Sequence, residues 1–197
     1  MAMAAGTLKA LWTERLETFT QVIHADTLTT WLEDPAVGGL VAETLLRVTQ
    51  AKGEATIQLI AALLHGSVAR FSNVLDPAVL MDIAAALTPA EIEVVVAMER
   101  AAAERDWDGL ELEEISASVG ADAGSDGLAR TTALLSRLAG HGLVASQADP
   151  IQDQGTYLGE IPALTGMRTT FRLTVLAQYL FDLARQGGWA PPSASTD

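Results

Sequence analysis

The segment LARTTALLSRLAGHGLV, residues 128–144, decides how this chain is interpreted. Its apolar residues recur at three- and four-residue spacing, which predicts a helix with one buried face. The predicted inner face consists of Leu128, Thr131, Leu135 and Leu138. Gly140 and Gly142 then allow the chain to reverse into a strand. A helix built this way keeps one side free, so we expect this part of the chain to bind a partner rather than to carry out chemistry.

Two more helices are predicted before this segment. Thr88, Pro89 and Glu91 have the spacing of a capping box, which satisfies the free amide groups at a helix start. A second helix is predicted over residues 112–119, where apolar residues again recur at helical spacing. Residues 121–127 are rich in glycine, aspartate and serine, which favours a turn.

A strand, a long loop and a closing helix are predicted after it. In residues 167–174 the odd-numbered positions are expected to face a core, while Arg168, Thr170 and Arg172 are expected to face solvent or phosphate. Thr174 is expected to cap the closing helix. Residues 148–166 contain several prolines and glycines and predict an unusually long loop.

Residues 1–86 predict a helical region. One helix follows a possible cap at Thr7, and a new helix is expected at Asp34 and Pro35, a cap followed by a proline in the first turn. The helix from Glu54 to Val74 is apolar around most of its circumference and is expected to be central. A short helix starts at Asp76 and Pro77, and residues 187–197 are expected to form a disordered tail.

In this order and spacing, residues 87–185 resemble a winged helix-turn-helix domain of the MarR type. The resemblance rests on residues 87–91, 112–115, 128–144 and 171–177. It implies a mainly α fold with a small β-wing, in which a helical dimerisation or effector region (residues 1–86) precedes a winged-helix domain (residues 87–186). It also implies a cytoplasmic regulator of transcription that binds double-stranded DNA as a homodimer. This chain departs from the type in its longer N-terminal region and longer wing.

The recognition helix of the resemblance falls at residues 127–139, and the wing at residues 145–173. Arg130 and Arg137 lie two helical turns apart, and arginine can form two hydrogen bonds to guanine in the major groove. The wing is expected on the DNA backbone. The candidate DNA-binding residues are Arg130, Thr132, Ala133, Ser136, Arg137, Arg168, Thr170 and Arg172. The alternative is a solvated helix face, with strand arginines that prevent edge-to-edge aggregation.

Charge supports a second interpretation. The 197 residues carry a net charge of −13, and residues 88–190 contain seven basic and fifteen acidic side chains. Because phosphate neutralisation supplies most non-specific DNA affinity, a DNA site would have to be a local basic patch. The alternative function is an acidic winged-helix module that binds a protein partner or acts as a scaffold, without DNA binding.

Other functional classes find little support in the sequence. Trp12, Trp31 and His65 are candidates for a small-molecule effector pocket, with core or dimer packing as the alternative. No cysteine is present and the three histidines lack ligand spacing, so no metal or cofactor is expected. No catalytic motif is found, and an enzyme is not expected. No apolar run reaches the ~18 residues of a membrane helix, and no signal peptide is expected.

Overall fold

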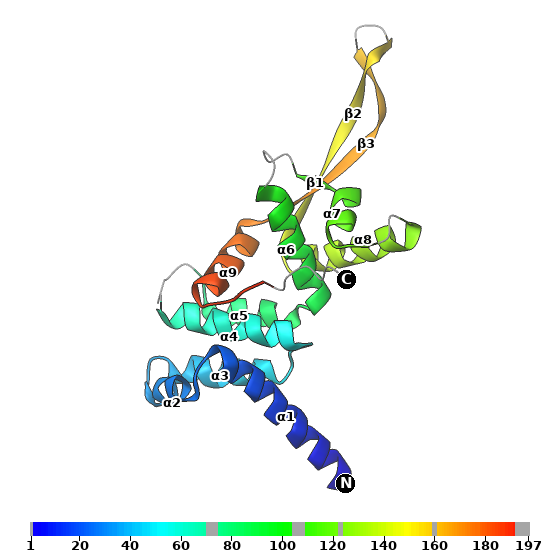
Figure 1. Ribbon diagram of the computed structural model, residues 1–197. Coiled ribbons are helices and arrows are strands. Elements are labelled where there is room, and N and C mark those ends of the chain that lie inside the picture. The colour runs from blue at the N-terminus through cyan, green and yellow to red at the C-terminus, as the bar shows by residue number, and fades with distance from the viewer. Residues whose placement is uncertain (1, 70–74, 104–108, 122–123, 159–160, 192–197) are drawn as a thin grey trace. The chain divides into compact units, whose positions relative to one another are not determined.

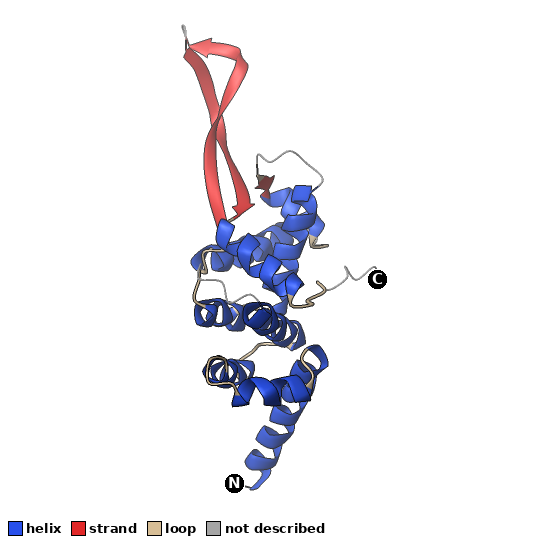
Figure 2. Ribbon diagram, turned by 90° about the vertical axis from the view of Figure 1, so that its left-hand side faces the viewer, coloured by secondary structure: helices blue, strands red, loops and turns tan. Residues whose placement is uncertain are grey.

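The structure, a computed structural model, describes residues 2–69, 75–103, 109–121, 124–158 and 161–191. It is mainly helical with one small antiparallel sheet, as the sequence predicted (Figures 1 and 2). The chain divides into two compact units: unit 1 comprises Met1–Ile92 and Gln178–Asp197, and unit 2 comprises Glu93–Ala177. Most of the closing helix therefore groups with the N-terminal helices, whereas the sequence placed it in the second domain.

The described part of unit 1 is built around one helix. It contains α1 (Ala2–Val22), α2 (Ala25–Glu33), α3 (Gly38–Val48), α4 (Glu54–Ala69), α5 (Pro77–Ala86), the start of α6 (Pro89–Ala103) and most of α9 (Val175–Gln186). α4 contacts α1, α3 and α5. Its residues Leu59, Ile60, Leu63 and Leu64 are completely buried. Because burying each such side chain stabilises the fold by about 1.5–3 kcal/mol, α4 holds the unit together, and the expected central helix is confirmed.

Hydrogen bonds between neighbouring residues determine where α5 and α3 begin. Asp76 caps α5 by accepting from the amide of Ala78 at 2.9 Å, as predicted. The same reasoning was wrong for α3, which begins at Gly38 and not at Asp34. There the Asp34 carboxylate accepts from the amide of Ala36 at 2.8 Å and the Asp34 carbonyl accepts from Gly38 at 2.8 Å. These bonds close a turn before the helix starts.

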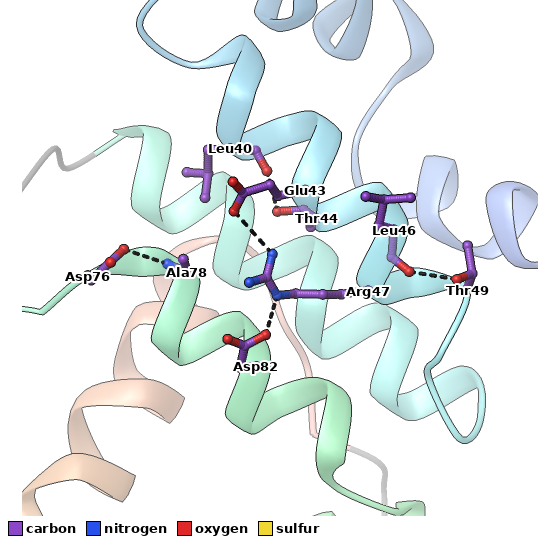
Figure 3. Close-up of polar contacts among 9 residues, drawn as sticks. All are labelled: Leu40, Glu43, Thr44, Leu46, Arg47, Thr49, Asp76, Ala78 and Asp82. Atoms are coloured by element: carbon purple, nitrogen blue, oxygen red, sulfur yellow. Dashed lines mark hydrogen bonds and ion pairs between the residues drawn. The ribbon is translucent and has the colours of Figure 1, made fainter.

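A polar contact joins α3 to α5 (Figure 3). Nε of Arg47 lies 2.5 Å from Oδ1 of Asp82, and its Nη1 lies 3.4 Å from Oε2 of Glu43. The hydrogen bond from Arg47 lowers the pKa of the Asp82 carboxyl below its ordinary value of 3.8, against a smaller opposing effect of burial. Both carboxylates are exposed, so solvent screens this contact and its contribution is modest.

The end of the chain packs on unit 1, in contrast to the expected disordered tail. Trp189 is 5% exposed, and its ring centroid lies 5.3 Å from that of Phe181. The carbonyl of Gly187 lies 3.2 Å from Nδ1 of His65, and a Cβ atom on Gly187 would lie 1.8 Å from the carbonyl oxygen of Ala62. Only glycine can approach α4 so closely. Residues 192–197 of the predicted tail lie outside the described residues.

Unit 2 combines helices with the sheet. After the rest of α6 come β1 (Leu110–Glu111), α7 (Leu112–Ser118), α8 (Ser125–Gly140), β2 (Val144–Leu158) and β3 (Ile161–Leu173). The strand order is β1-β3-β2, and both pairings are antiparallel. The predicted capping box of α6 is confirmed, since the Glu91 carboxylate accepts from the amide and the hydroxyl of Thr88 at 2.7 Å each. Thr174 caps α9, accepting from the amide of Ala177 at 3.2 Å.

The predicted long loop over residues 148–166 is wrong. β2 and β3 remain paired from Val144↔Leu173 to Leu158↔Ile161, and they continue as a two-stranded ribbon beyond β1 and α7 (Figures 1 and 2). Two register irregularities fall at residues 151/152 and 153/157. Proline is tolerated on edge strands and beside bulges. The prolines and glycines that suggested a loop are thus accommodated within a hairpin.

The packing of Gly187 predicts a large effect of one methyl group. Gly187→Ala is expected to lower the free energy of unfolding by about 1–3 kcal/mol, because the added Cβ meets the backbone of α4. Gly39→Ala is the matched control, since a Cβ there meets nothing within 4 Å, and alanine at this helical position should stabilise by up to about 1 kcal/mol. Thermal unfolding of both variants checks this. Equal melting temperatures would contradict the close packing of the C-terminal segment.

The contact between Arg47 and Asp82 predicts a pH dependence. Because the pKa of Asp82 is lowered in the folded protein, its contribution to stability is fully present above the ordinary pKa and is lost as the pH falls through the lowered pKa. Asp82→Asn should therefore destabilise by less than about 1 kcal/mol at neutral pH, and the difference should vanish in acid. Urea unfolding across the acid range measures it. Glu17→Gln removes an exposed carboxylate from α1 and serves as the control for the loss of one negative charge.

Candidate nucleic-acid interface

α8 is held in unit 2 by one face. Thr131 and Leu135 are 1% exposed and Leu138 is completely buried. The Thr131 hydroxyl lies 3.0 Å from the carbonyl oxygen of Gly127 and 3.4 Å from the hydroxyl of Ser116 in α7. These contacts confirm three of the four residues predicted for the inner face, while Leu128 is half-buried. The opposite face of α8 consequently points away from the core of unit 2.

This outer face of α8 is narrow and carries arginine at one edge. Its exposed residues include Ala129, Arg130, Thr132, Ala133, Ser136, Arg137 and Gly140. With about 3.6 residues per turn, the small side chains at 129, 133, 136 and 140 follow one line along the helix. Arg130 and Arg137 lie together on one side of that line. The small side chains let this face approach another surface closely. The two arginine side chains extend from one edge of the face.

The polar groups of this face are partly engaged. The hydroxyl of Thr132 donates to the carbonyl of Leu128 at 2.8 Å, and that of Ser136 donates to the carbonyl of Thr132 at 2.9 Å. Both hydroxyls therefore retain acceptor capacity, whereas their protons are used within the helix. Among the described residues, the Arg130 side chain has no ion pair or hydrogen bond. Asp126, in the first turn of α8, is the acidic neighbour one turn before it.

The strand residues predicted for DNA binding do not all lie on a free face. Arg172 is exposed, and Nε of Arg168 forms an ion pair with Oε1 of Glu111. Thr170 is 8% exposed, so its expected solvent-facing position is wrong. It lies opposite Glu111 in the β1–β3 pairing, and a Cβ on Gly109, whose φ is 91°, would lie 2.9 Å from its Cβ. The unpredicted strand β1 covers it.

The expected inward positions of β3 are also wrong near the ribbon. Met167 is 67% exposed and Thr169 is exposed, whereas Leu173 is buried as expected. The reason is the length of the hairpin, because β3 extends well beyond the two residues of β1. In that part of β3 the alternating side chains have no core to pack against. Among the expected inward positions of residues 167–173, Leu173 is buried and Phe171 is half-buried, whereas Met167 and Thr169 are exposed.

Glu111 stands out in the sequence only as one of several acidic residues near a helix start, and its structural role was not predicted. Its carboxylate pairs with Arg168, and its amide donates to Oε2 of Glu114 at 3.0 Å, within a capping box at the start of α7. The spacing of Glu111 and Glu114 is a capping signal that was available in the sequence. A strand of two residues, however, is too short to leave any periodicity. Glu111 thus joins the start of α7 to strand β3.

The predicted effector residues are brought together in part. The rings of Trp31 and His65 have centroids 5.7 Å apart, and His65 is exposed rather than part of the core. Trp12 is 42% exposed on α1. A cavity of about 180 Å³ lies between residues 11–18 of α1 and residues 51–57, and none of the three predicted residues lines it. Trp31 and His65 therefore lie side by side in unit 1, and the cavity described here is not the predicted effector pocket.

The described residues contain no cluster of three or more metal-ligating side chains. None of the described helices is both long enough and apolar enough to cross a membrane. Comparisons of the chain with models of protein families, with curated proteins and with solved structures found no match.

Proposed function

We propose that this protein is a dimeric winged-helix regulator of transcription, with α8 in the major groove of double-stranded DNA and the β2–β3 wing on the backbone. The order of elements in unit 2 supports this. Helix α6, strand β1, helices α7 and α8, and the hairpin follow in turn, and β3 lies between β1 and β2. A helix-turn-helix protein presents its second helix to the groove in such an arrangement.

The observation that carries the proposal is the outer face of α8. The helix buries Leu135 and Leu138 and exposes small side chains with Arg130 and Arg137 beside them. The major groove is about 12 Å wide and admits an α-helix. Small residues on the outer face of α8 let the helix backbone come near the edges of the bases. The arginine side chains beside them can then reach guanine.

The acidity of unit 2 limits where DNA can bind. Residues 93–177 contain six arginines and thirteen acidic side chains. Four of these arginines are on the two proposed DNA-contacting elements: Arg130 and Arg137 on α8, and Arg168 and Arg172 on β3. Because attraction to phosphate depends on local charge at ordinary salt, where the Debye length is about 8–10 Å, this concentration supports a local DNA site on an acidic protein.

Unit 1 is the proposed dimerisation region. Among the described residues of unit 1, the large apolar side chains that are at least two-fifths exposed are Leu11, Trp12, Leu32, Leu46 and Val79. The N-terminal half of α1 also extends away from α2, α3 and α4 (Figures 1 and 2). Exposed apolar surface of this kind is often covered by a partner. A role of Trp31 and His65 in sensing an effector stays a prediction.

The alternative function remains an acidic module that binds a protein or acts as a scaffold. The excess of acidic side chains in unit 2 favours it, and so does the ion pair of Arg168 with Glu111, which already occupies one of the wing arginines. A line of small residues on α8 also suits close packing against another helix. This alternative predicts no affinity for DNA at about 0.1 M salt.

Arginine substitutions on α8 test the proposed function. Arg130→Ala and Arg137→Ala should each weaken binding to a selected DNA duplex by about 5- to 150-fold, the value of a good bidentate contact. Fluorescence anisotropy at several salt concentrations measures the affinity. The control is Arg185→Ala, which removes the same charge from unit 1, where Arg185 pairs with Asp182 at 3.1 Å. Undiminished binding by the double α8 variant would remove α8 as the recognition helix.

Freeing Arg168 should strengthen DNA binding. Glu111→Gln removes the acidic partner of Arg168 but keeps the backbone amide that caps against Glu114. Since an exposed ion pair is worth up to about 1 kcal/mol, affinity should rise by up to about fivefold. Glu93→Gln removes an equal charge from an exposed site on α6 and serves as the matched control. An equal gain in both variants would mean that only net charge matters and that the wing arginine does not contact DNA.

The oligomeric state tests the role given to unit 1. Light scattering should give a molar mass near twice the 20.7 kDa of one chain. Leu46→Asp, at a side chain 62% exposed on α3, should shift the protein toward monomer because it places a charge in the proposed apolar interface. Met167→Asp, equally exposed but on the wing, should leave the mass unchanged. A monomeric parent protein would contradict the dimer.

A further inference from the structure

We infer that the cavity between α1 and the start of α4 binds a free α-amino acid with an aliphatic side chain. The cavity has a volume of about 180 Å³, and it is lined by residues of α1, of the connection between α3 and α4, and of the first turn of α4. It lies wholly in unit 1. This site therefore goes beyond the proposed function and does not depend on DNA binding.

The volume of the cavity sets the size of the ligand. A cavity of about 150 Å³ is large enough for benzene. The cavity of unit 1 is slightly larger, and it therefore suits a ligand of about six to nine non-hydrogen atoms. Pockets for drug-sized ligands are larger, about 300–1,000 Å³. Free valine, leucine, isoleucine and methionine fall in the smaller range.

The floor of the cavity is apolar. Ala51 is 1% exposed and Ile57 is 4% exposed, and Leu11 of α1 contributes a third apolar side chain to the lining. Moving a hydrocarbon group from water onto such a surface is favourable. The floor therefore suits the aliphatic side chain of the ligand.

Charged residues surround the opening, with one cation and one anion on each wall. Glu14 and Arg15 come from α1, whereas Lys52 and Glu54 come from the other wall. Arg15 is half-buried and the other three are exposed. A ligand with a single charge would meet a like charge on both walls, which is unfavourable. A zwitterion can offer its carboxylate to the cations and its ammonium group to the anions, and an α-amino acid carries both groups at one end.

The two cations are held in place by backbone carbonyls. Nη1 of Arg15 donates to the carbonyl of Val48 at 3.1 Å and also to the carbonyl of Thr49. Nζ of Lys52 donates to the carbonyl of Ala86 at 2.6 Å. Among the described residues, neither cation forms an ion pair. Because a guanidinium and an ammonium group each carry several N–H donors, both side chains keep donors for the carboxylate of a ligand.

The two anions keep acceptor sites for the ammonium group. Within the part of the chain that the structure describes, the carboxylate of Glu14 has no ion pair. Oε1 of Glu54 accepts from Nε2 of Gln58 at 3.1 Å. A carboxylate can accept several hydrogen bonds, so Glu54 can still bind a donor of the ligand.

Calorimetric titration of the full-length protein with L-valine, L-leucine, L-isoleucine and L-methionine tests the site. At least one of them should bind saturably. Two analogues of the tightest ligand then separate its charges: the carboxylic acid without the amino group and the amine without the carboxyl group. Each analogue should bind at least about fivefold more weakly than the amino acid, because it loses one ion pair and meets a like charge.

Substitutions at the opening assign each charge to its partner. Glu14→Gln should weaken binding of the amino acid by about fivefold and should not weaken binding of the acid analogue. Lys52→Gln should have the same effect on the amino acid and should not weaken binding of the amine analogue. Glu17→Gln is the matched control, since Glu17 is an exposed carboxylate of α1 that does not line the cavity, and it should bind as the parent protein does.

Three results would overturn the assigned ligand. They are no saturable binding of any of the four amino acids up to about 10 mM, well above a millimolar dissociation constant, equal affinity for the amino acid and both analogues, or parent-like affinity in both Glu14→Gln and Lys52→Gln. None of these measurements involves DNA. Failure of the amino-acid site would therefore leave the proposed function standing, and failure of DNA binding would leave this site standing.

Discussion

The pairing of β3 with the two-residue strand β1 organises unit 2. It places Glu111 opposite Thr170, buries that threonine, and sets Glu111 where it pairs with Arg168 and caps α7 together with Glu114. α7 in turn supports α8 through Ser116 and Thr131. A contact of two residues thus connects the wing, the supporting helix and the proposed recognition helix. Each of these contacts is short and partly buried. The outer face of α8 is therefore positioned by contacts on the inner face of the helix, and its exposed side chains are not needed to hold it in place.

The charge distribution explains how an acidic protein can still be a candidate for DNA binding. A net charge of −13 opposes approach to DNA at long range. At contact distance the balance depends on which charges lie within about one Debye length. Arg130 and Arg172 are exposed on α8 and β3, while Arg168 shares its charge with Glu111. Under the proposed function, such a surface would bind weakly to arbitrary DNA and gain most of its affinity from correct bases, which is a route to specificity rather than to general attraction.

The sequence revealed those parts of the fold that depend on neighbouring residues. The caps at Asp76, Glu91 and Thr174 were predicted because each helix start carries its own signal, and the inner face of α8 was predicted from helical spacing. Strand β1 and the packed C-terminal segment were missed because they depend on partners far along the chain, whereas the long hairpin was missed because its prolines and glycines indicated a loop. Arg130 and Arg137 were assigned correctly to an exposed face, whereas the burial of Thr170 depends on a strand that leaves no periodic pattern.

Unit 1 is assembled from both ends of the chain, and this affects how the protein is made. Residues 93–177 are contiguous and complete unit 2, whereas the first 92 residues must wait for residues 178–197. During synthesis, α4 will leave the ribosome long before the C-terminal segment that packs on it, with Leu183 against Gly66 and Gly187 against Ala62. A nascent chain that exposes so apolar a helix is a natural client of chaperones. Translation pausing after the wing would then prolong the most aggregation-prone stage of its biogenesis.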